Sequence, residues 1–309
     1  MNITFLSLLF STTFGLSWLG LHRYSNEENN LCEFEGLTRP QKRLCQKYPQ
    51  FQPALKAASL STVNLCKSTM KGHLWGCQGA DKLPAVGPEL SQATSESAFV
   101  HALGAGQLLA ALKKICRSGA TGNCDDAELR MFAIQFTDVL AMSRRAKGQK
   151  TVELHNNDVG RTTADRHSRL ICKCHGQSGS CTQKTCWRGS PDPEKVAIEL
   201  SAKYESAAKV RAQDELPAIF RQYVVRDRLL YIKNSINHCA TTQGRECNPD
   251  LSEKSSCERL CCGRGNIKRV LREPRRECKM ETIKVDGSLW PAGIKCKTVY
   301  DETTSYSCL

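Results

Sequence analysis

Residues 172–186 contain the densest set of groups that could do chemistry: four cysteines, one histidine and two serines. The cysteines are nested, so that Cys174 with Cys181, inside Cys172 with Cys186, would give two bridges across one hairpin. The residues between the inner pair are small or turn-forming, as a tight reversal requires. We therefore expect a disulfide-braced hairpin that holds Ser178 at an exposed tip.

Three kinds of chemistry could use this segment. Residues 176–180 nearly match the Gly-x-Ser-x-Gly elbow of serine hydrolases, but that elbow needs a strand-to-helix turn and a remote base. His175 is too close in sequence to be that base. The cysteines and His175 are zinc-ligand types, although Cys-x-Cys-His is not a standard tetrahedral spacing. In the third interpretation, Ser178 is an exposed point of attachment or contact.

The composition favours export to an oxidising compartment. The chain has 309 residues and 18 cysteines, a density at which cysteine persists as disulfide only outside the cytosol. Residues 3–21 are mostly apolar and uncharged, which predicts a signal peptide with cleavage within residues 15–17 or near Gly20. A retained membrane anchor is the alternative, since the run only just reaches spanning length. The expected location is the extracellular space or matrix.

The spread of cysteines and apolar residues indicates an α+β protein. Three stretches carry apolar residues at helical spacing and predict core-facing helices: residues 99–115, interrupted by Gly104 and Gly106, residues 129–140, and residues 193–208 with Asp192 as cap. Eight cysteines fall within residues 239–308, which have too few apolar residues to hold together without bridges.

The expected organisation has four parts. They are a signal peptide (1–20), a helical N-terminal domain (21–211) that carries the β-hairpin (172–186), a linker (212–235) and a small cysteine-rich β domain (236–309).

Motifs spread along the chain resemble the signatures of the Wnt family of secreted signalling proteins. Cys-His-Gly-x-Ser-Gly-Ser-Cys at residues 174–181, followed by Lys-Thr-Cys-Trp at residues 184–187, resembles the hairpin signature. Leu-His-Asn-Asn-Asp-Val-Gly-Arg at residues 154–161, Thr-Gln-Gly-Arg-Glu-Cys at 242–247 and Cys-Cys-Gly-Arg-Gly at 261–265 also fit. The likeness covers almost the whole expected mature chain.

The resemblance implies a lipidated ligand with no enzymatic activity. In the family, the serine that matches Ser178 is esterified with palmitoleate by the acyltransferase Porcupine, and the lipid enters a groove on the cysteine-rich domain of Frizzled receptors. The implied function is activation of Wnt signalling through Frizzled and a low-density-lipoprotein-receptor-related co-receptor. The resemblance implies no cofactor other than the covalent acyl group, and no bound metal. Ser180 is the competing acceptor.

The family pairing also implies the disulfides. Cysteines are fewer than in most relatives, but they are missing in whole pairs, which leaves no thiol unpaired. The expected bridges are Cys66–Cys77, Cys116–Cys124, Cys172–Cys186, Cys174–Cys181, Cys239–Cys262, Cys247–Cys257, Cys261–Cys308 and Cys278–Cys296, with Cys32–Cys45 as the remaining pair.

One expected receptor contact departs from the family pattern. Relatives have a cysteine-braced finger with an apolar tip that contacts Frizzled, whereas residues 279–295 contain no cysteine. Leu289 and Trp290 are candidate replacements, and packing of Trp290 on its own loop is the alternative. The altered finger keeps open a second function, that of an antagonist or decoy. A secreted serine hydrolase using Ser178 is the third and least favoured.

The net charge of +13, from 44 Lys and Arg against 31 Asp and Glu, calls for an acidic partner or surface. The resemblance implies heparan sulfate, and the alternative is a solvated face that aids solubility. Export argues against a nucleic-acid partner. The candidate glycan-binding residues are Lys268, Arg269, Arg272, Arg275 and Arg276.

Overall fold

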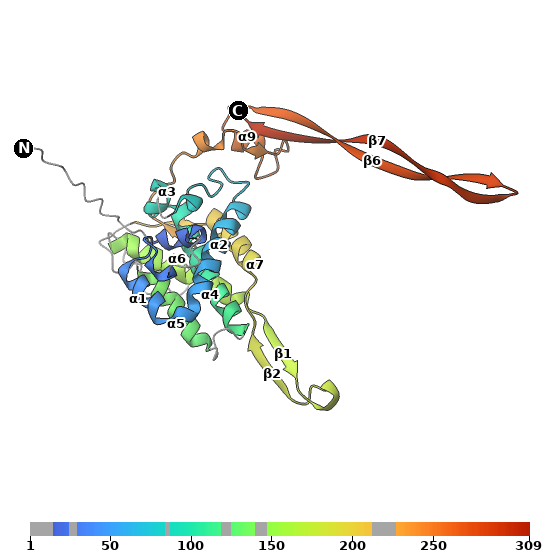
Figure 1. Ribbon diagram of the computed structural model, residues 1–309. Helices are drawn as coiled ribbons and strands as arrows, with labels where there is room; N and C mark the ends of the chain where they lie inside the picture. The colour runs from blue at the N-terminus through green and yellow to red at the C-terminus, as the bar shows by residue number, and fades with distance from the viewer. Residues whose placement is uncertain (1–14, 25–29, 84–86, 119–124, 140–146, 212–226) are drawn as a thin grey trace, which may run out of the picture. The chain divides into compact units, whose positions relative to one another are not determined.

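The computed structural model describes residues 15–24, 30–83, 87–118, 125–139, 147–211 and 227–309, without the side chains of residues 88, 147, 282–285, 288–290 and 292. The chain divides into two compact units. Unit 1 comprises residues 1–71 and 76–236, and unit 2 comprises residues 72–75 and 237–309. Unit 1 is mainly helical, and a long two-stranded ribbon dominates unit 2 (Figure 1). The expected α+β class is confirmed.

Unit 1 is built around one buried helix, α4. Its helices are α1 (Arg39–Lys47), α2 (Gln52–Thr69), α3 (Pro88–Ser91), α4 (Ser95–Arg117), α5 (Asp126–Thr137), α6 (Lys147–Arg166) and α7 (Pro193–Glu205). Helix α4 packs against α2, α5, α6 and α7, and its buried residues therefore lie on all sides. None of the helices in the described ranges is long and apolar enough to cross a membrane.

Two glycines allow α4 and α6 to approach closely. A Cβ added to Gly160 of α6 would lie 1.8 Å from the carbonyl oxygen of Ala102 in α4. A Cβ added to Gly106 of α4 would lie 2.9 Å from the carbonyl oxygen of Gly160. Side chains fit at neither position, so this helix contact requires both glycines. Gly106 lowers helix propensity, but it is needed for packing.

Polar side chains of α6 hold the neighbouring segments. The Asn156 side-chain amide donates to the Leu230 carbonyl and accepts from the Leu230 N–H, both at 2.9 Å. Arg161, which is buried, forms two hydrogen bonds with the Asp138 carboxylate just beyond α5. The motif at residues 154–161 is therefore structural: it fixes the helix that precedes the hairpin.

Part of the expected linker belongs to unit 1. Strand β3 (Ala208–Lys209) pairs in parallel with β4 (Leu230–Tyr231), and Leu230 is fully buried in a small apolar cluster. Ala208, which we expected on the face of a helix, lies in this strand because α7 ends at Glu205. The remainder of the linker, residues 212–226, lies outside the described residues.

Residues 16–21 contribute to the core of unit 1. Leu16 caps a 3₁₀-helix (Ser17–Arg23) that contains the other five, and their apolar side chains are at most 2 % exposed. The Trp18 ring meets the Phe136 ring edge to face, with centroids 5.6 Å apart. A leader that ended at residue 20 would remove Trp18 from this core. We therefore propose that the leader ends before Leu16.

Unit 2 has a small core made largely of disulfides. Its elements are a 3₁₀-helix (Cys239–Thr242), β5 (Glu246–Cys247), α9 (Cys257–Leu260) and two long antiparallel strands, β6 (Asn266–Val285) and β7 (Ser288–Cys308). Four half-cystines and Leu260 form the buried cluster, with Tyr306 packed against them. Arg245 donates hydrogen bonds to the carbonyls of His73 and Leu74, which ties residues 72–75 to this unit.

Eight disulfides join described residues, and each joins a pair that the resemblance implied. They are Cys32–Cys45, Cys66–Cys77, Cys172–Cys186, Cys174–Cys181, Cys239–Cys262, Cys247–Cys257, Cys261–Cys308 and Cys278–Cys296. Cys116 is also disulfide-bonded, and Cys124, its expected partner, lies outside the described residues. No cysteine in the described ranges is free.

The glycine contact between α4 and α6 can be tested by Gly160→Ala. Overpacking a core typically costs about 1–3 kcal/mol, and here the added methyl meets backbone, so we expect a loss of about 3 kcal/mol or more. Urea unfolding followed by circular dichroism measures it. Gly72→Ala is the matched control, since its Cβ would lie 3.5 Å from the nearest atom. Equal stability of the two variants would contradict the contact.

The proposed leader boundary predicts the mature N-terminus. Because residues 16–21 are buried, the secreted protein should begin at or before Leu16. Mass spectrometry of the N-terminal peptide of the secreted chain determines this directly. A mature chain that starts at Leu21 and has the stability of a longer one would show the boundary to be wrong.

Candidate functional site: the braced hairpin

The chemistry-bearing segment forms a two-stranded hairpin. Strand β1 (Leu170–Cys174) pairs antiparallel with β2 (Lys184–Arg188), and Cys172 lies directly opposite Cys186. Both strands are exposed, so the hairpin has no apolar core. It projects from the helices of unit 1 (Figure 1). Its two disulfides close short loops and take the place of a core, each contributing about 2–4 kcal/mol.

The backbone at the tip holds Ser178 in an exposed left-handed conformation. Ser178 has φ 58° and ψ 27°, and Gly179 follows with φ 78°. Few residues other than glycine adopt this region, and β-branched ones are the least suited to it. The Gly179 N–H donates to the Gly176 carbonyl at 3.0 Å and closes the turn. The tip therefore has one defined shape, with Ser178 at its apex.

The two serines of the tip differ in their hydrogen bonds. The Ser180 hydroxyl lies 3.2 Å from that of Thr182, and the Ser180 carbonyl accepts from the Gly176 N–H at 2.8 Å. The Ser178 hydroxyl has no hydrogen-bond partner within the described part of the chain. Ser178 is therefore the freer hydroxyl for attachment of another group.

The hairpin lacks the requirements of the two competing chemistries. Ser178 lies in a turn between two strands rather than between a strand and a helix, and no described histidine or carboxylate bonds to it. All four cysteines are in disulfides, so they offer no thiolate to zinc. The arrangement can present an attached group, but it does not activate Ser178 as a nucleophile.

The second expected receptor contact lies at the tip of the unit 2 ribbon. Asp286 and Gly287 form its two-residue loop, with φ 51° and 84°, as in a type I′ turn. Strand β7 begins at Ser288, directly after this loop, and Leu289 and Trp290 are its second and third residues. Their side chains lie outside the described part, so their contact role stays a prediction.

The candidate glycan-binding residues lie on both faces of the β6–β7 ribbon. One face carries Lys268, Arg272 and Arg276, and the other carries Arg269 and Arg275. Arg272 pairs with Glu302 at 2.7 Å and Arg275 with Asp301 at 2.9 Å. The other three have no acidic partner among the described residues. The cluster is thus divided, and two of its charges are neutralised.

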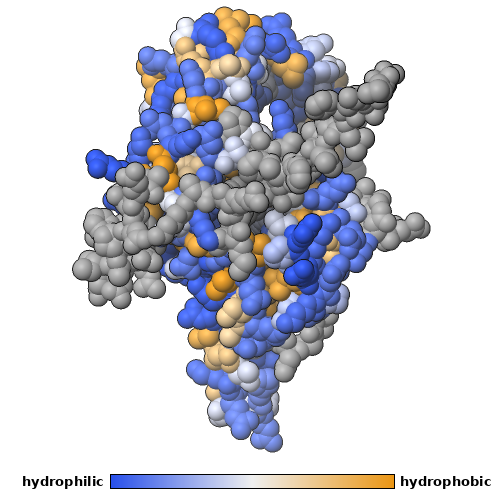
Figure 2. Space-filling view, turned by 90° about the vertical axis from the view of Figure 1, so that its left-hand side faces the viewer, coloured by the Kyte–Doolittle hydropathy of each residue, from blue (hydrophilic) through white to orange (hydrophobic). Residues whose placement is uncertain are grey.

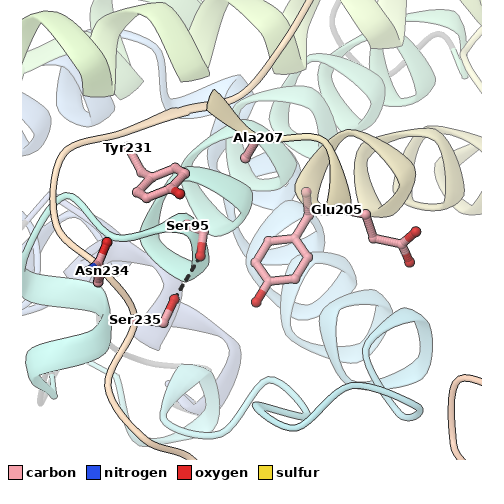
Figure 3. A pocket seen from close by; sticks show the side chains of 7 residues that line it. Ser95, Glu205, Ala207, Tyr231, Asn234 and Ser235 are labelled. Atoms are coloured by element: carbon pink, nitrogen blue, oxygen red, sulfur yellow. Dashed lines mark hydrogen bonds between the residues drawn. The ribbon is translucent and has the colours of Figure 1, made fainter. Parts of the chain in front are cut away.

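A polar hollow of about 260 Å³ in unit 1 is a further concave feature (Figure 3). It is lined by Ser95, Tyr204, Glu205, Ala207, Tyr231, Asn234 and Ser235. The buried Glu96 carboxylate accepts hydrogen bonds from two of these lining residues, Tyr204 at 3.1 Å and Ser235 at 2.8 Å. Burial, with the Glu96 charge, raises the pKa of Tyr204, which keeps its hydroxyl a donor. These bonds hold Ser235 to Glu96 of α4.

The exposed apolar and basic side chains of the hairpin strands were not predicted from the sequence. Leu170, Ile171 and Trp187 are 68 %, 46 % and 37 % exposed. The available signal was the absence of any acidic residue from residue 168 to residue 191, together with four lysines and arginines.

Comparison with known proteins agrees with the motifs. The model of the Wnt family matches residues 33–131 and 129–309. Protein Wnt-16 of Bos taurus is 29 % identical, over 94 % of this chain and 91 % of the relative. Protein Wnt-11b of Xenopus laevis is 30 % identical, over 95 % of this chain and 94 % of the relative.

The fold comparison points the same way. The solved structure of human WLS in complex with WNT8A matches with a TM-score of 0.57 and 25 % identity, and the match covers 82 % of this chain and 94 % of the other. The family match, the fold and the hairpin geometry all support the same family assignment. The chain belongs to the Wnt family, whose members are secreted signalling ligands rather than enzymes.

Proposed function

We propose that this chain is a lipid-modified Wnt ligand that carries a palmitoleoyl group on Ser178 and binds Frizzled-type receptors through it. The observation that carries the proposal is the exposed Ser178 hydroxyl at the apex of a doubly disulfide-braced turn. A rigid tip presents the lipid at low entropic cost. Each CH₂ of the chain that the receptor buries contributes about 0.8 kcal/mol.

The remaining partners follow from family membership. Acylation of Ser178 requires a Porcupine-type acyltransferase during secretion, and activation requires a low-density-lipoprotein-receptor-related co-receptor. The related chain solved with WLS supports a WLS-type partner for this chain too. The proposed export signal is the apolar leader upstream of Leu16.

Replacement of Ser178 tests the proposal. Ser178→Ala should remove the acyl mass from the chain and reduce signalling to background. Loss of even six buried CH₂ groups corresponds to about 5 kcal/mol, or roughly a 10³–10⁴-fold loss of affinity. Intact mass spectrometry, Frizzled-domain binding and a β-catenin reporter measure the three effects. A Ser178→Ala chain that remains acylated and signals would show that the acceptor lies elsewhere.

Two further variants separate attachment from turn geometry. Ser180→Ala should keep acylation, since its hydroxyl bonds within the hairpin. Ser178→Thr keeps a hydroxyl but places a β-branched residue at φ 58°, which is unfavourable. We expect its acyl occupancy to fall between those of wild type and Ser178→Ala.

The altered finger supports an antagonist as the second candidate function. The ribbon continues beyond Cys278–Cys296 to the Asp286 turn without another disulfide in the described ladder. An acylated wild-type chain that binds Frizzled but blocks the reporter response to another Wnt would assign this function. A fluorophosphonate probe that labels Ser178 would instead support the hydrolase.

Heparan sulfate is the proposed partner of the basic residues on the β6–β7 ribbon. The ion pairs indicate which of these residues should contribute most to binding. Substitution of Lys268, Arg269 and Arg276 by Gln should lower the salt at which the protein elutes from heparin, because these charges have no acidic partner among the described residues. Arg272→Gln with Arg275→Gln is the control and should have a smaller effect per charge. Elution of wild type at ordinary salt would contradict glycan binding.

A further inference from the structure

The hairpin has a one-sided charge. Residues 168–191 contain Arg169, Lys173, Lys184 and Arg188 and no aspartate or glutamate. All four side chains are exposed, and none pairs with a carboxylate among the described residues. Every other charged surface discussed above includes acidic partners. The hairpin strands therefore present only positive charge to their surroundings.

Exposed apolar side chains are interleaved with these charges. Ile171 lies opposite Trp187 and shares its face with Lys173, while Leu170 lies opposite Arg188 on the other face. Figure 2 shows the lower end of unit 1, formed by the hairpin, as a mainly hydrophilic tip with apolar patches above it. Both faces of the hairpin therefore combine apolar and cationic groups.

This combination fits a lipid surface better than a sulfated glycan. A glycan would bind the charges but leave Leu170, Ile171 and Trp187 in water, whereas a bilayer interface takes both kinds of side chain. Tryptophan favours the headgroup region, where its ring is partly apolar and partly polar. Lysine and arginine are attracted to anionic headgroups.

We propose that the strands of this hairpin bind the surface of an anionic lipid bilayer directly. The binding does not require acylation of Ser178. It supplies a second anchoring signal next to the acylation site, and one acyl chain alone gives only marginal, reversible membrane attachment. The hairpin would thus hold the chain at a membrane before or between its contacts with protein partners.

The test uses the full-length Ser178→Ala protein, so that no acyl chain contributes. It is sedimented with vesicles of phosphatidylcholine alone or with about one third phosphatidylserine. Binding should require the anionic lipid. Each basic residue near such a surface is worth about fivefold in partitioning, so replacing Arg169, Lys173, Lys184 and Arg188 by Gln should weaken binding about 100-fold or more.

The matched control removes four other exposed charges of unit 1 that have no role in any site above. They are Arg39, Arg43, Lys47 and Lys56, each replaced by Gln. Made in the Ser178→Ala protein, this variant should bind the vesicles nearly as well as Ser178→Ala itself does. Trp187→Ala, which keeps all charges, should weaken binding several-fold and so separate insertion from charge attraction.

Three results would overturn the proposal. One is a Ser178→Ala protein that does not sediment with anionic vesicles at low salt. Another is an equal loss in the hairpin and control variants, which would mean that net charge alone acts. The third is a hairpin variant that loses heparin binding but not vesicle binding, which would assign the surface to a glycan. None of these depends on whether wild-type Ser178 is acylated.

Discussion

Disulfides that stand in for a hydrophobic core are the constraint on which the projecting parts of this molecule depend. The hairpin is exposed on both strands, and a two-stranded ribbon of this kind is at best marginally stable in water. Cys172–Cys186 fixes the register of its strands, and Cys174–Cys181 fixes the turn. Without them, the left-handed conformation of Ser178 would be one state among many. Oxidation in the secretory pathway is thus a condition for presenting the proposed acyl site.

The helices do a different task, which is to give this hairpin a rigid base. Helix α6 ends at Arg166, and β1 begins at Leu170, so the position of α6 sets where the hairpin begins. That position is fixed by a backbone contact at Gly160 and by the ion pair of the buried Arg161 with Asp138. The family motif at residues 154–161 of α6 therefore contributes to function indirectly, by positioning the hairpin. Its side chains hold the helix and do not reach the tip.

The features that could be predicted are those that produce a recognisable spacing of residue types along the sequence. Nested cysteines predicted the hairpin, and apolar spacing predicted α4 and α5 because one or more of their faces is buried. The length of the β6–β7 ribbon left no such pattern, since alternation requires one buried face and its strands are exposed on both. Residues 72–75 join unit 2 through hydrogen bonds from Arg245, a contact between positions too distant in the chain for local spacing to indicate. The φ of Ser178 could not be read from its residue type either, because serine rarely adopts that region.

The β6–β7 ribbon and the β1–β2 hairpin also differ in whether acidic residues accompany their basic ones. This difference indicates that they bind different partners. Strands β6 and β7 carry basic residues, but cross-strand acids neutralise several, as in the pairs Arg272–Glu302 and Lys297–Glu277. Such exposed pairs contribute little to stability, and their effect is to lower the local positive potential. The β1–β2 hairpin has no acid to do the same. A partner of the long ribbon must therefore tolerate a mixed surface, whereas a partner of the hairpin strands meets uniform positive charge beside exposed Trp187 and Ile171. An anionic bilayer interface can bind both the positive charges and the apolar side chains of the hairpin. Its headgroups and acyl chains lie within a few ångströms of each other.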